Sequence, residues 1–149
     1  MILYIGADHR GFKLKETLKQ FLHDSGYTVN DMGNAQYDEN DDYPDLIMSA
    51  AKKVAENTRN NRGIVLGGSG QGEAIVANRH KGVRATVYAA RSLDLELVKL
   101  MREHNDSNVL SLGARFVPEE DANQVVKAWL ETPFSGEERH KRRIAKIDP

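Results

Sequence analysis

The regular alternation of short apolar runs with longer amphipathic segments constrains the fold of this chain more than any other feature of its sequence. Short aliphatic runs bounded by glycine or polar turn residues are typical of buried parallel strands, because both faces of such strands are covered. The expected strands are Ile2–Ile5, Tyr27–Val29, Ile64–Leu66, Ala85–Val87 and Val109–Leu112. The expected helices are about 12–25, Pro44–Glu56, Gly72–Asn78, Ser92–Glu103, Pro118–Glu131 and the strongly basic Glu137–Ile147.

This order of elements predicts an α/β fold, in which parallel strands are joined by right-handed crossovers through helices that cover both faces of the sheet. With 149 residues, the chain is expected to form a single domain over residues 1–149. Ligands bind such sheets beyond the carboxyl ends of the strands, near the point where the strand order reverses. Functional residues are therefore expected in the segments that follow the strands.

Composition narrows the class of protein. The net charge is −1, so no basic excess points to a nucleic-acid partner, and no apolar stretch approaches the length of a membrane span. The chain has no cysteine, which excludes disulfides, thiolate metal sites and cysteine nucleophiles. The N-terminal segment MILYIGADHRG lacks the features of a signal peptide and is expected to be a first strand. A cytoplasmic protein is expected.

The stretch RGIVLGGSGQGEAIVANR, residues 62–79, places a glycine-rich turn between a strand and a helix. Turns of this kind hold anions, because unpaired backbone N–H groups converge there. The spacing does not match the dinucleotide-binding G-x-G-x-x-G pattern, and no Lys-Ser/Thr pair follows as in a Walker A loop. The glycines at positions 67, 68, 70 and 72 exceed what a tight turn needs, so we interpret the loop as an anion-binding cradle.

Glu73 places a carboxylate at the mouth of this cradle. In a purely structural role, it would favour the helix dipole by about 0.3–1 kcal/mol. In a chemical role, it would be a base that removes a proton from carbon while the loop amides hold the oxyanion that forms. A phosphate dianion in the cradle would be repelled by Glu73, whereas an oxyanion formed by its action would not. The second arrangement makes the loop and the carboxylate cooperate.

Other polar groups also follow the strands or end the helices. Asp8 and His9 lie after the first strand, and they suit either a structural turn or the same site. His104 and Asn105 suit a helix C-terminus, or proton transfer and oxyanion contact. Arg139 and Arg143 stand four residues apart on one helix face, where they would grip a phosphate dianion or form part of a solvated basic tail.

A metal site is not expected. The histidines at positions 9, 23, 80, 104 and 140 include no pair spaced four residues apart on a helix, and no cysteine is present to complete a ligand set.

Several motifs in order along the chain resemble the ribose-5-phosphate isomerase B family of sugar-phosphate isomerases, which includes the galactose-6-phosphate and allose-6-phosphate isomerases. They are GADHRGF, DYPD at 42–45, GGSGQGE, ANR at 77–79, REHND, GAR at 113–115 and RHKRR. The resemblance implies a Rossmann-like three-layer sandwich with a five-stranded parallel sheet and a basic C-terminal helix. It also implies a homodimer, or a dimer of such dimers, in which both subunits build each active site.

The family divides by its catalytic base. One branch uses a cysteine at the position of Gly67, and the other uses a glutamate at the position of Glu73; this chain, which has no cysteine, resembles the second branch. The resemblance implies that Ser69 assists proton movement, Asp8 and His104 are candidates for opening the sugar ring, and Asn105 stabilises negative charge. The implied substrate-binding residues are His9, Tyr43, Gly68, Gly70, Gly72, Arg115, Arg139 and Arg143.

The implied activity is aldose–ketose isomerisation between D-ribose 5-phosphate and D-ribulose 5-phosphate through an enediolate, without cofactor or metal, within carbohydrate metabolism such as the pentose phosphate pathway. Other functions stay open at this stage. They are isomerisation of a six-carbon sugar phosphate, non-catalytic binding of a sugar phosphate, and binding of a nucleotide or flavin.

Overall fold

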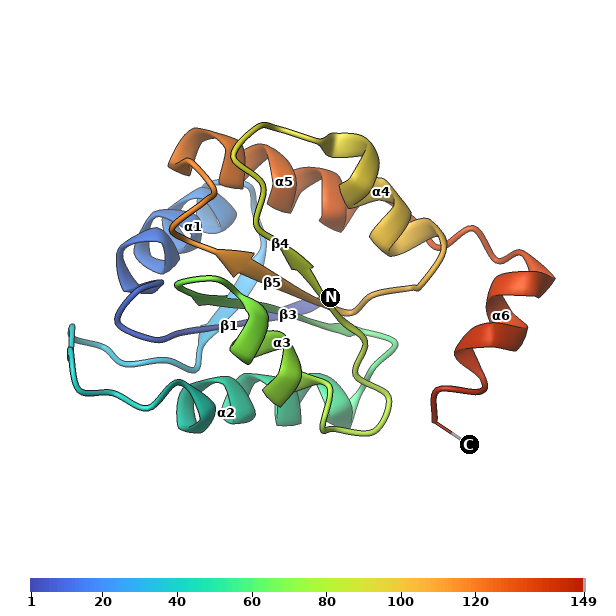
Figure 1. Cartoon of the computed structure of the whole chain (residues 1–149), viewed down its shortest axis with the longest axis horizontal. Helices are drawn as coiled ribbons and strands as arrows, with labels where there is room; N and C mark the ends of the chain where they lie inside the picture. The colour runs from blue at the N-terminus through green and yellow to red at the C-terminus, as the bar shows by residue number, and fades with distance from the viewer. Residues whose placement is uncertain (149) are drawn as a thin grey trace.

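The computed structural model describes residues 1–148 and contains one parallel sheet between two layers of helices (Figure 1). The strands are β1 (Ile2–Ala7), β2 (Thr28–Asp31), β3 (Asn61–Gly67), β4 (Ala85–Tyr88) and β5 (Val109–Gly113). The helices are α1 (Phe12–Asp24), α2 (Tyr43–Glu56), α3 (Gln71–Ala77), α4 (Leu95–Glu103), α5 (Glu119–Glu131) and α6 (Glu138–Ile144). The predicted five-stranded α/β fold is confirmed.

The strand order is β2-β1-β3-β5-β4, and every pair in the sheet is parallel. From β1 the chain passes to β2 on one side, whereas β3 lies on the other side and leads to β5 and β4. The strand order therefore reverses between β1 and β3. In open α/β sheets this reversal opens a crevice beyond the carboxyl ends of the two strands, which is where a ligand binds.

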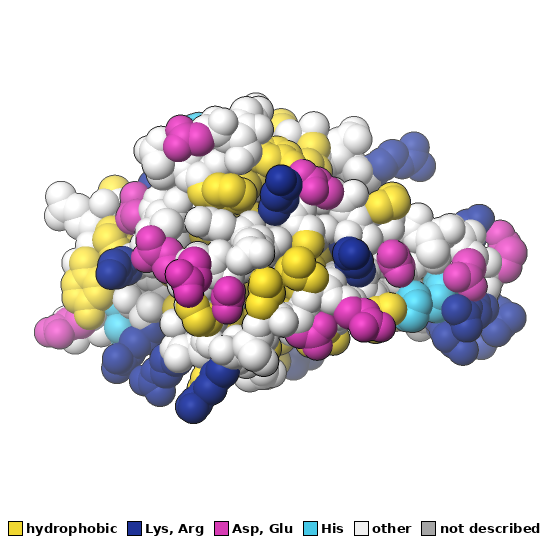
Figure 2. All heavy atoms as spheres, turned by 90° about the horizontal axis from the view of Figure 1, so that it is seen from above, with side chains coloured by type: hydrophobic (Ala, Val, Ile, Leu, Met, Phe, Trp, Pro, Cys, Tyr) yellow, Lys and Arg dark blue, Asp and Glu magenta, His cyan; other side chains and the backbone are white. Residues whose placement is uncertain are grey.

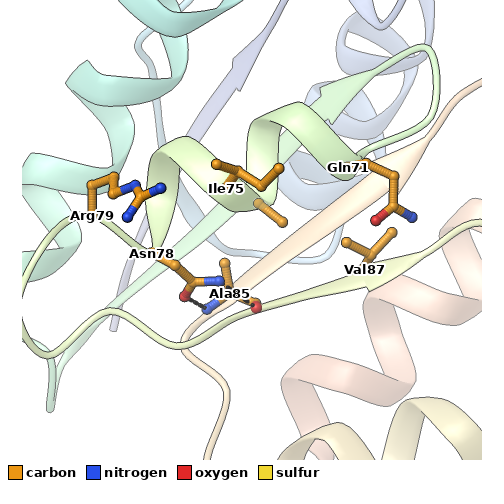
Figure 3. Close-up of a pocket in the computed structure, with 7 residues that line it drawn as sticks. Gln71, Ile75, Asn78, Arg79, Ala85 and Val87 are labelled. Atoms are coloured by element: carbon orange, nitrogen blue, oxygen red, sulfur yellow. Dashed lines mark hydrogen bonds between the residues drawn. The ribbon is translucent and has the colours of Figure 1, made fainter. Parts of the chain in front are cut away.

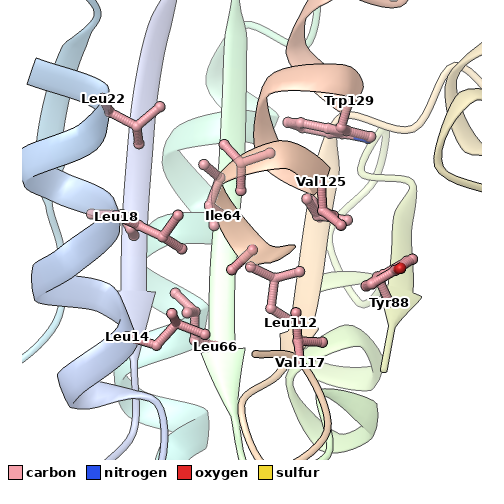
Figure 4. Packing of buried hydrophobic residues seen from close by; sticks show 14 of the residues in the cluster. Leu14, Leu18, Leu22, Ile64, Leu66, Tyr88, Leu112, Val117, Val125 and Trp129 are labelled. Atoms are coloured by element: carbon pink, nitrogen blue, oxygen red, sulfur yellow. The ribbon is translucent and has the colours of Figure 1, made fainter. Parts of the chain in front are cut away.

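The two faces of the sheet carry separate apolar layers. Along β3 the side chains alternate, so that Ile64 and Leu66 face one layer and Val65 faces the other. Figure 4 shows the first layer, in which α1 lies on one side of β3 and Trp129 of α5 packs on the other. Helices α2 and α3 form the second layer, with Ile47 fully buried. Apolar side chains pack against both faces of the sheet, and the sheet positions the loops that leave its carboxyl edge.

Helix α4 begins at Leu95, three residues later than the expected Ser92. The Asp94 side chain accepts a hydrogen bond from the N–H of Leu97 at 2.9 Å, which caps the helix. The Tyr88 hydroxyl accepts the N–H of Asp94 at 2.9 Å and donates to the carbonyl of Ser92 at 3.4 Å. These bonds hold residues 92–94 in a turn instead of a helix.

Helix α6 is shorter than the expected Glu137–Ile147 and stands away from the sheet, near the C-terminus in Figure 1. Its approach is fixed by a hydrogen bond from the N–H of Ser135 to the carbonyl of Glu103 at 3.2 Å. After the helix, the Asp148 carboxylate accepts the N–H of Gly82 at 2.6 Å. In the described part of the chain, no helix has the length and apolar character needed to cross a membrane.

Replacement of Ile64 by alanine tests the central strand as the core of the fold. Ile64 is 0% exposed, so we expect Ile64→Ala to lower the free energy of unfolding by about 2–5 kcal/mol through lost burial and an unfilled cavity. Ile2→Ala is the matched control, because Ile2 is 38% exposed. Urea unfolding monitored by circular dichroism measures both. An equal loss in the two variants would contradict the assignment of the core.

Candidate active site

The glycine loop follows β3 and leads into α3, at the edge of the sheet predicted to bind a ligand. The carbonyls of Gly67 and Gly68 accept the N–H groups of Ala114 and Arg115 at 2.8 and 3.1 Å, so they point toward the segment after β5. In a trans peptide the next N–H points the opposite way. The N–H groups of Gly68 and Ser69 therefore point away from this segment, as donors in an anion cradle would.

Gly70 closes the loop in a conformation that other residues rarely adopt. Its φ is 76°, and a Cβ there would lie 3.1 Å from backbone atoms of Leu112 and Gly113. Its carbonyl accepts a hydrogen bond from the buried Ser111 hydroxyl at 2.6 Å. The loop is thus fixed by β5 and positions the first turn of α3.

Glu73 lies in this first turn, and its side chain folds back against the start of the loop. The residue is only 4% exposed. A Cβ on Gly67 would overlap the Glu73 carboxylate, with Oε1 as its nearest neighbour. The Glu73 side chain can therefore take this position only because residue 67 is a glycine.

Burial raises the pKa of Glu73 above its ordinary value, because a charge in this position loses its hydration. The negative charge of Asp8 raises the pKa further, whereas hydrogen bonds from the N–H groups of Glu73 itself and of Gly70 lower it. The net direction is upward. A carboxyl group with a raised pKa is a stronger base once it is ionised, which suits proton abstraction near neutral pH.

Asp8 lies after β1 and is 7% exposed. Its Oδ1 accepts the N–H groups of Arg10 and Gly11, both at 2.9 Å, and this closes the turn that leads into α1. The turn brings Asp8 close enough to Glu73 for their charges to interact. The structural and the functional interpretations of Asp8 are therefore compatible.

Asp41 contacts His9, one of the predicted site residues, and was not itself predicted from the sequence. Its Oδ1 lies 2.7 Å from Nδ1 of His9 and also accepts the N–H of His9 at 3.1 Å. With Nδ1 facing a carboxylate, the His9 imidazole has a fixed orientation, and its Nε2 is left for a ligand. The signal available in the sequence was the acidic run DENDDYPD, residues 38–45, but it does not tell which carboxylate faces His9.

Two further predicted residues lie beside the loop. The Tyr43 ring packs so closely on Gly72 that a Cβ there would lie 2.9 Å from Cζ. The Nε of Arg115 lies 3.5 Å from the position of a Cβ on Gly68. Ser69 is exposed in the loop, and its hydroxyl accepts the N–H of Gln71 at 3.3 Å. One chain therefore gathers nine of the predicted residues at this edge: Asp8, His9, Tyr43, Gly68, Ser69, Gly70, Gly72, Glu73 and Arg115.

The remaining four predicted residues lie at the opposite edge of the sheet. His104 and Asn105 precede β5, whereas the glycine loop follows β3, and the two strands are parallel. Strand β3 has seven residues, so the two edges are separated by about 20 Å at 3.3 Å per residue. Arg139 and Arg143 lie on α6, at the same edge as His104. Within one chain, these residues do not face Glu73.

The second group is basic and largely exposed. Figure 2 shows basic side chains and histidine gathered at the end of the molecule that α6 occupies in Figure 1. The ring of His104 stacks on that of His140 with 4.4 Å between centroids. Nε of Arg139 pairs with Glu137 at 2.8 Å in a surface ion pair of low expected strength. The guanidinium groups on this helix are thus accessible to an anion from outside the chain.

A shallow groove runs between α3 and the edge strand β4 (Figure 3). Its apolar side chains include Ile75, which is 58% exposed, and Val87. The Asn78 amide donates to the carbonyl of Ala85 at 3.0 Å and accepts its N–H at 2.7 Å, which closes one end of the groove. Among residues 1–148, no three His, Asp or Glu side chains are grouped so that they could hold a metal ion.

The chain is similar to known proteins over nearly its whole length. Residues 3–147 match the family model described as Ribose/Galactose Isomerase. The chain is 40% identical over 144 residues to the ribose-5-phosphate isomerase B of Mycolicibacterium paratuberculosis, covering 97% of this chain and 87% of that protein.

Solved structures are also similar. Ribose-5-phosphate isomerase B of Mycoplasma genitalium, with bound ribulose-5-phosphate, has a TM-score of 0.92 and 36% identity over 98% of this chain and 93% of that chain. The enzyme of Clostridium thermocellum has a TM-score of 0.90 and 39% identity over 99% of this chain and 95% of that chain.

The burial of Glu73 leads to a prediction on stability. Below about pH 4 the Glu73 carboxyl group is protonated in both the folded and the unfolded chain, so its ionisation does not change the free energy of unfolding. As the pH rises, Glu73 ionises in the unfolded chain before it ionises in the folded chain, because its pKa is raised by folding. The free energy of unfolding therefore falls until the pH passes the raised pKa of Glu73. We expect Glu73→Gln to raise the Tm at pH 7 and to leave it nearly unchanged at pH 4.

Scanning calorimetry at the two pH values measures this difference, with Glu39→Gln as the matched control because Glu39 is exposed. A Tm gain of the same size at both pH values, or the same gain in the control, would show that the carboxylate is not strained by burial.

Proposed function

The chain belongs to the ribose/galactose isomerase family, and we propose that Glu73 is the base with which it interconverts D-ribose 5-phosphate and D-ribulose 5-phosphate. The observation that carries the proposal is the contact between Glu73 and the glycine loop, where a buried carboxylate of raised pKa stands beside backbone donors. Base and oxyanion donors must act on adjacent atoms of one substrate, and this loop supplies both.

The reaction begins with opening of the sugar ring, for which Asp8 and His104 are the proposed acid–base groups. Glu73 then removes the proton from C2, and the electron pair forms the C1–C2 double bond of a cis-enediolate while the C1 oxygen takes the charge. The amides of residues 68–72 and the Asn105 side chain stabilise this charge. Ser69 moves a proton between the two oxygens, and Glu73 returns its proton to C1 to give the ketose.

The phosphate group is held at the far end of the substrate. His9, oriented by Asp41, and Arg115 come from the edge that carries Glu73. Arg139 and Arg143 supply two guanidinium groups, which bind phosphate oxygens with paired hydrogen bonds. Tyr43 lines the space between. Anchoring the phosphate lets binding energy far from the reacting carbons orient C1 and C2 against Glu73.

A second copy of the chain completes the site in this proposal. The two groups of residues lie about 20 Å apart within one chain, by the length of β3 at 3.3 Å per residue. A two-fold dimer brings the His104 and α6 edge of one subunit to the Glu73 edge of the other. The groove between α3 and the unpaired edge of β4 is lined by Ala74, the residue after Glu73, and exposes Ile75, and we propose that the partner covers it.

The structure gives less support to two other functions. A protein that only binds sugar phosphate gains nothing from a buried carboxylate beside its anion cradle, since the charge weakens binding. An isomerase of six-carbon sugar phosphates would use the same residues, so rates on ribose, allose and galactose phosphates measured side by side distinguish the substrates. We also propose that the chain acts as a single cytoplasmic domain without cofactor or metal.

The role of Glu73 is tested by two variants. We expect Glu73→Gln to lower kcat for ribose 5-phosphate at least about 10²-fold, the lower end for loss of a general base, with substrate binding largely kept. We expect Gly67→Ala to lower kcat comparably, because its methyl group displaces the carboxylate. Steady-state kinetics measure the rates and calorimetric titration measures binding. Full activity of Glu73→Gln would show that Glu73 is not the base.

The shared site is tested by mixing inactive variants. Glu73→Gln and the double variant Arg139→Ala/Arg143→Ala each spoil both sites of a homodimer, but a hybrid of the two has one intact site. After refolding an equimolar mixture, we expect about a quarter of the wild-type rate, since half of randomly paired dimers are hybrids with one site of two restored.

The control mixes Glu73→Gln with a variant that carries all three substitutions, in which no pairing restores a site. Recovery in the control, or none in the test mixture at substrate concentrations below KM, would contradict a site built from two subunits.

A further inference from the structure

His140 is a buried side chain that the proposed mechanism leaves without a role. It lies within α6 and is 3% exposed, yet its Nε2 has no hydrogen-bond partner among the described residues. Buried polar atoms in proteins are normally paired, so an unpaired one calls for an explanation. The neighbours Lys141 and Arg142 are exposed, so burial on this helix is specific to one position.

The contact that buries His140 is a stack on His104. The ring centroids are 4.4 Å apart and the rings are inclined by 15°, which places them nearly parallel. His104 is the residue at the C-terminal end of α4, where the backbone leaves the helix. Among the described hydrogen bonds and ion pairs none involves the His104 ring, so the stack on His140 is the interaction that orients it.

The stack also joins two functional parts of the chain. His140 lies between Arg139 and Arg143, which are the proposed phosphate ligands. Helix α6 stands away from the sheet and is held by the bond from Ser135 to Glu103 before it and by the bond from Gly82 to Asp148 after it. Between these two bonds, the ring stack relates α6 to the end of α4.

We propose that His140 is a positioning residue, whose ring fixes the plane and location of the His104 imidazole and couples this acid–base group to the helix that carries Arg139 and Arg143. The inference rests on the proposed function, and it adds to it a residue that acts through another. The stack holds His104 at a fixed place relative to the two arginines, so that ring opening and phosphate binding are aligned.

The electrostatics of the pair support this role. Burial lowers the pKa of His140, and the positive charges of Arg139, His104 and Arg143 lower it further, whereas Glu137 raises it. A neutral ring of His140 stacks on His104 without adding a second positive charge at short range.

Three variants test the proposal: His140→Ala, which removes the stacking ring, His140→Phe, which keeps an aromatic ring but no polar atom, and Arg142→Ala as the exposed control on the same helix. We expect His140→Ala to lower kcat for ribose 5-phosphate by about 10- to 100-fold, the scale for a misplaced catalytic group. His140→Phe should restore most of kcat, and the control should match the wild type.

If His140→Phe is as slow as His140→Ala while both fold, the imidazole acts through its nitrogen atoms and the positioning role is wrong. If His140→Ala keeps the full rate, the stack has no role in catalysis. A rise in KM alone would mean that His140 serves only the phosphate-binding helix, which also overturns the proposal.

A second measurement does not depend on turnover. In the substrate-free protein, proton NMR should show the His104 ring resonances shifted downfield in His140→Ala and close to their wild-type positions in His140→Phe, because only the first loses the shielding of a stacked ring. Unchanged resonances in His140→Ala would show that the rings are not stacked in solution. This result stands even if the chain prefers another sugar phosphate.

Discussion

The structure of this site depends on one unfavourable interaction, the burial of an ionisable carboxyl group at the carboxyl end of β3. Water is excluded from Glu73 by the loop of residues 67–70 and by the sheet below it, and this exclusion raises the pKa of its carboxyl group. The favourable packing of the rest of the fold offsets the unfavourable free energy of this burial. Two buried apolar layers hold the strands in register, and Ser111 and residues 114–115 hold the loop from β5. Without this rigidity the chain would relax by exposing the carboxylate.

Much of this could be predicted from the sequence. The alternation of apolar runs with amphipathic segments gave the strands and helices, because period and length are local properties of the chain. Helix starts were less accurate: α4 begins at Leu95 because Asp94 and Tyr88 take hydrogen bonds whose partners a pattern does not reveal. For the same reason Asp41 was missed. Its contact with His9 spans 32 positions, and several acidic residues nearby were equally eligible.

The sequence also grouped residues that one chain keeps apart. His104, Asn105, Arg139 and Arg143 carry chemistry that fits the site of Glu73, but the parallel sheet places them at its other edge. Periodicity and motif spacing describe one chain and contain no information about which edge meets a neighbouring molecule. The separation is itself informative, since a set of complementary groups divided between two edges is what a two-fold assembly would bring together.

The contact between position 67 and Glu73 also limits which residues position 67 can hold. A side chain at position 67 and the carboxylate at position 73 would occupy the same volume, so a residue larger than glycine at position 67 requires the Glu73 side chain to move. The two positions are therefore coupled, because a side chain added at position 67 displaces the proposed base although residue 73 itself is unchanged.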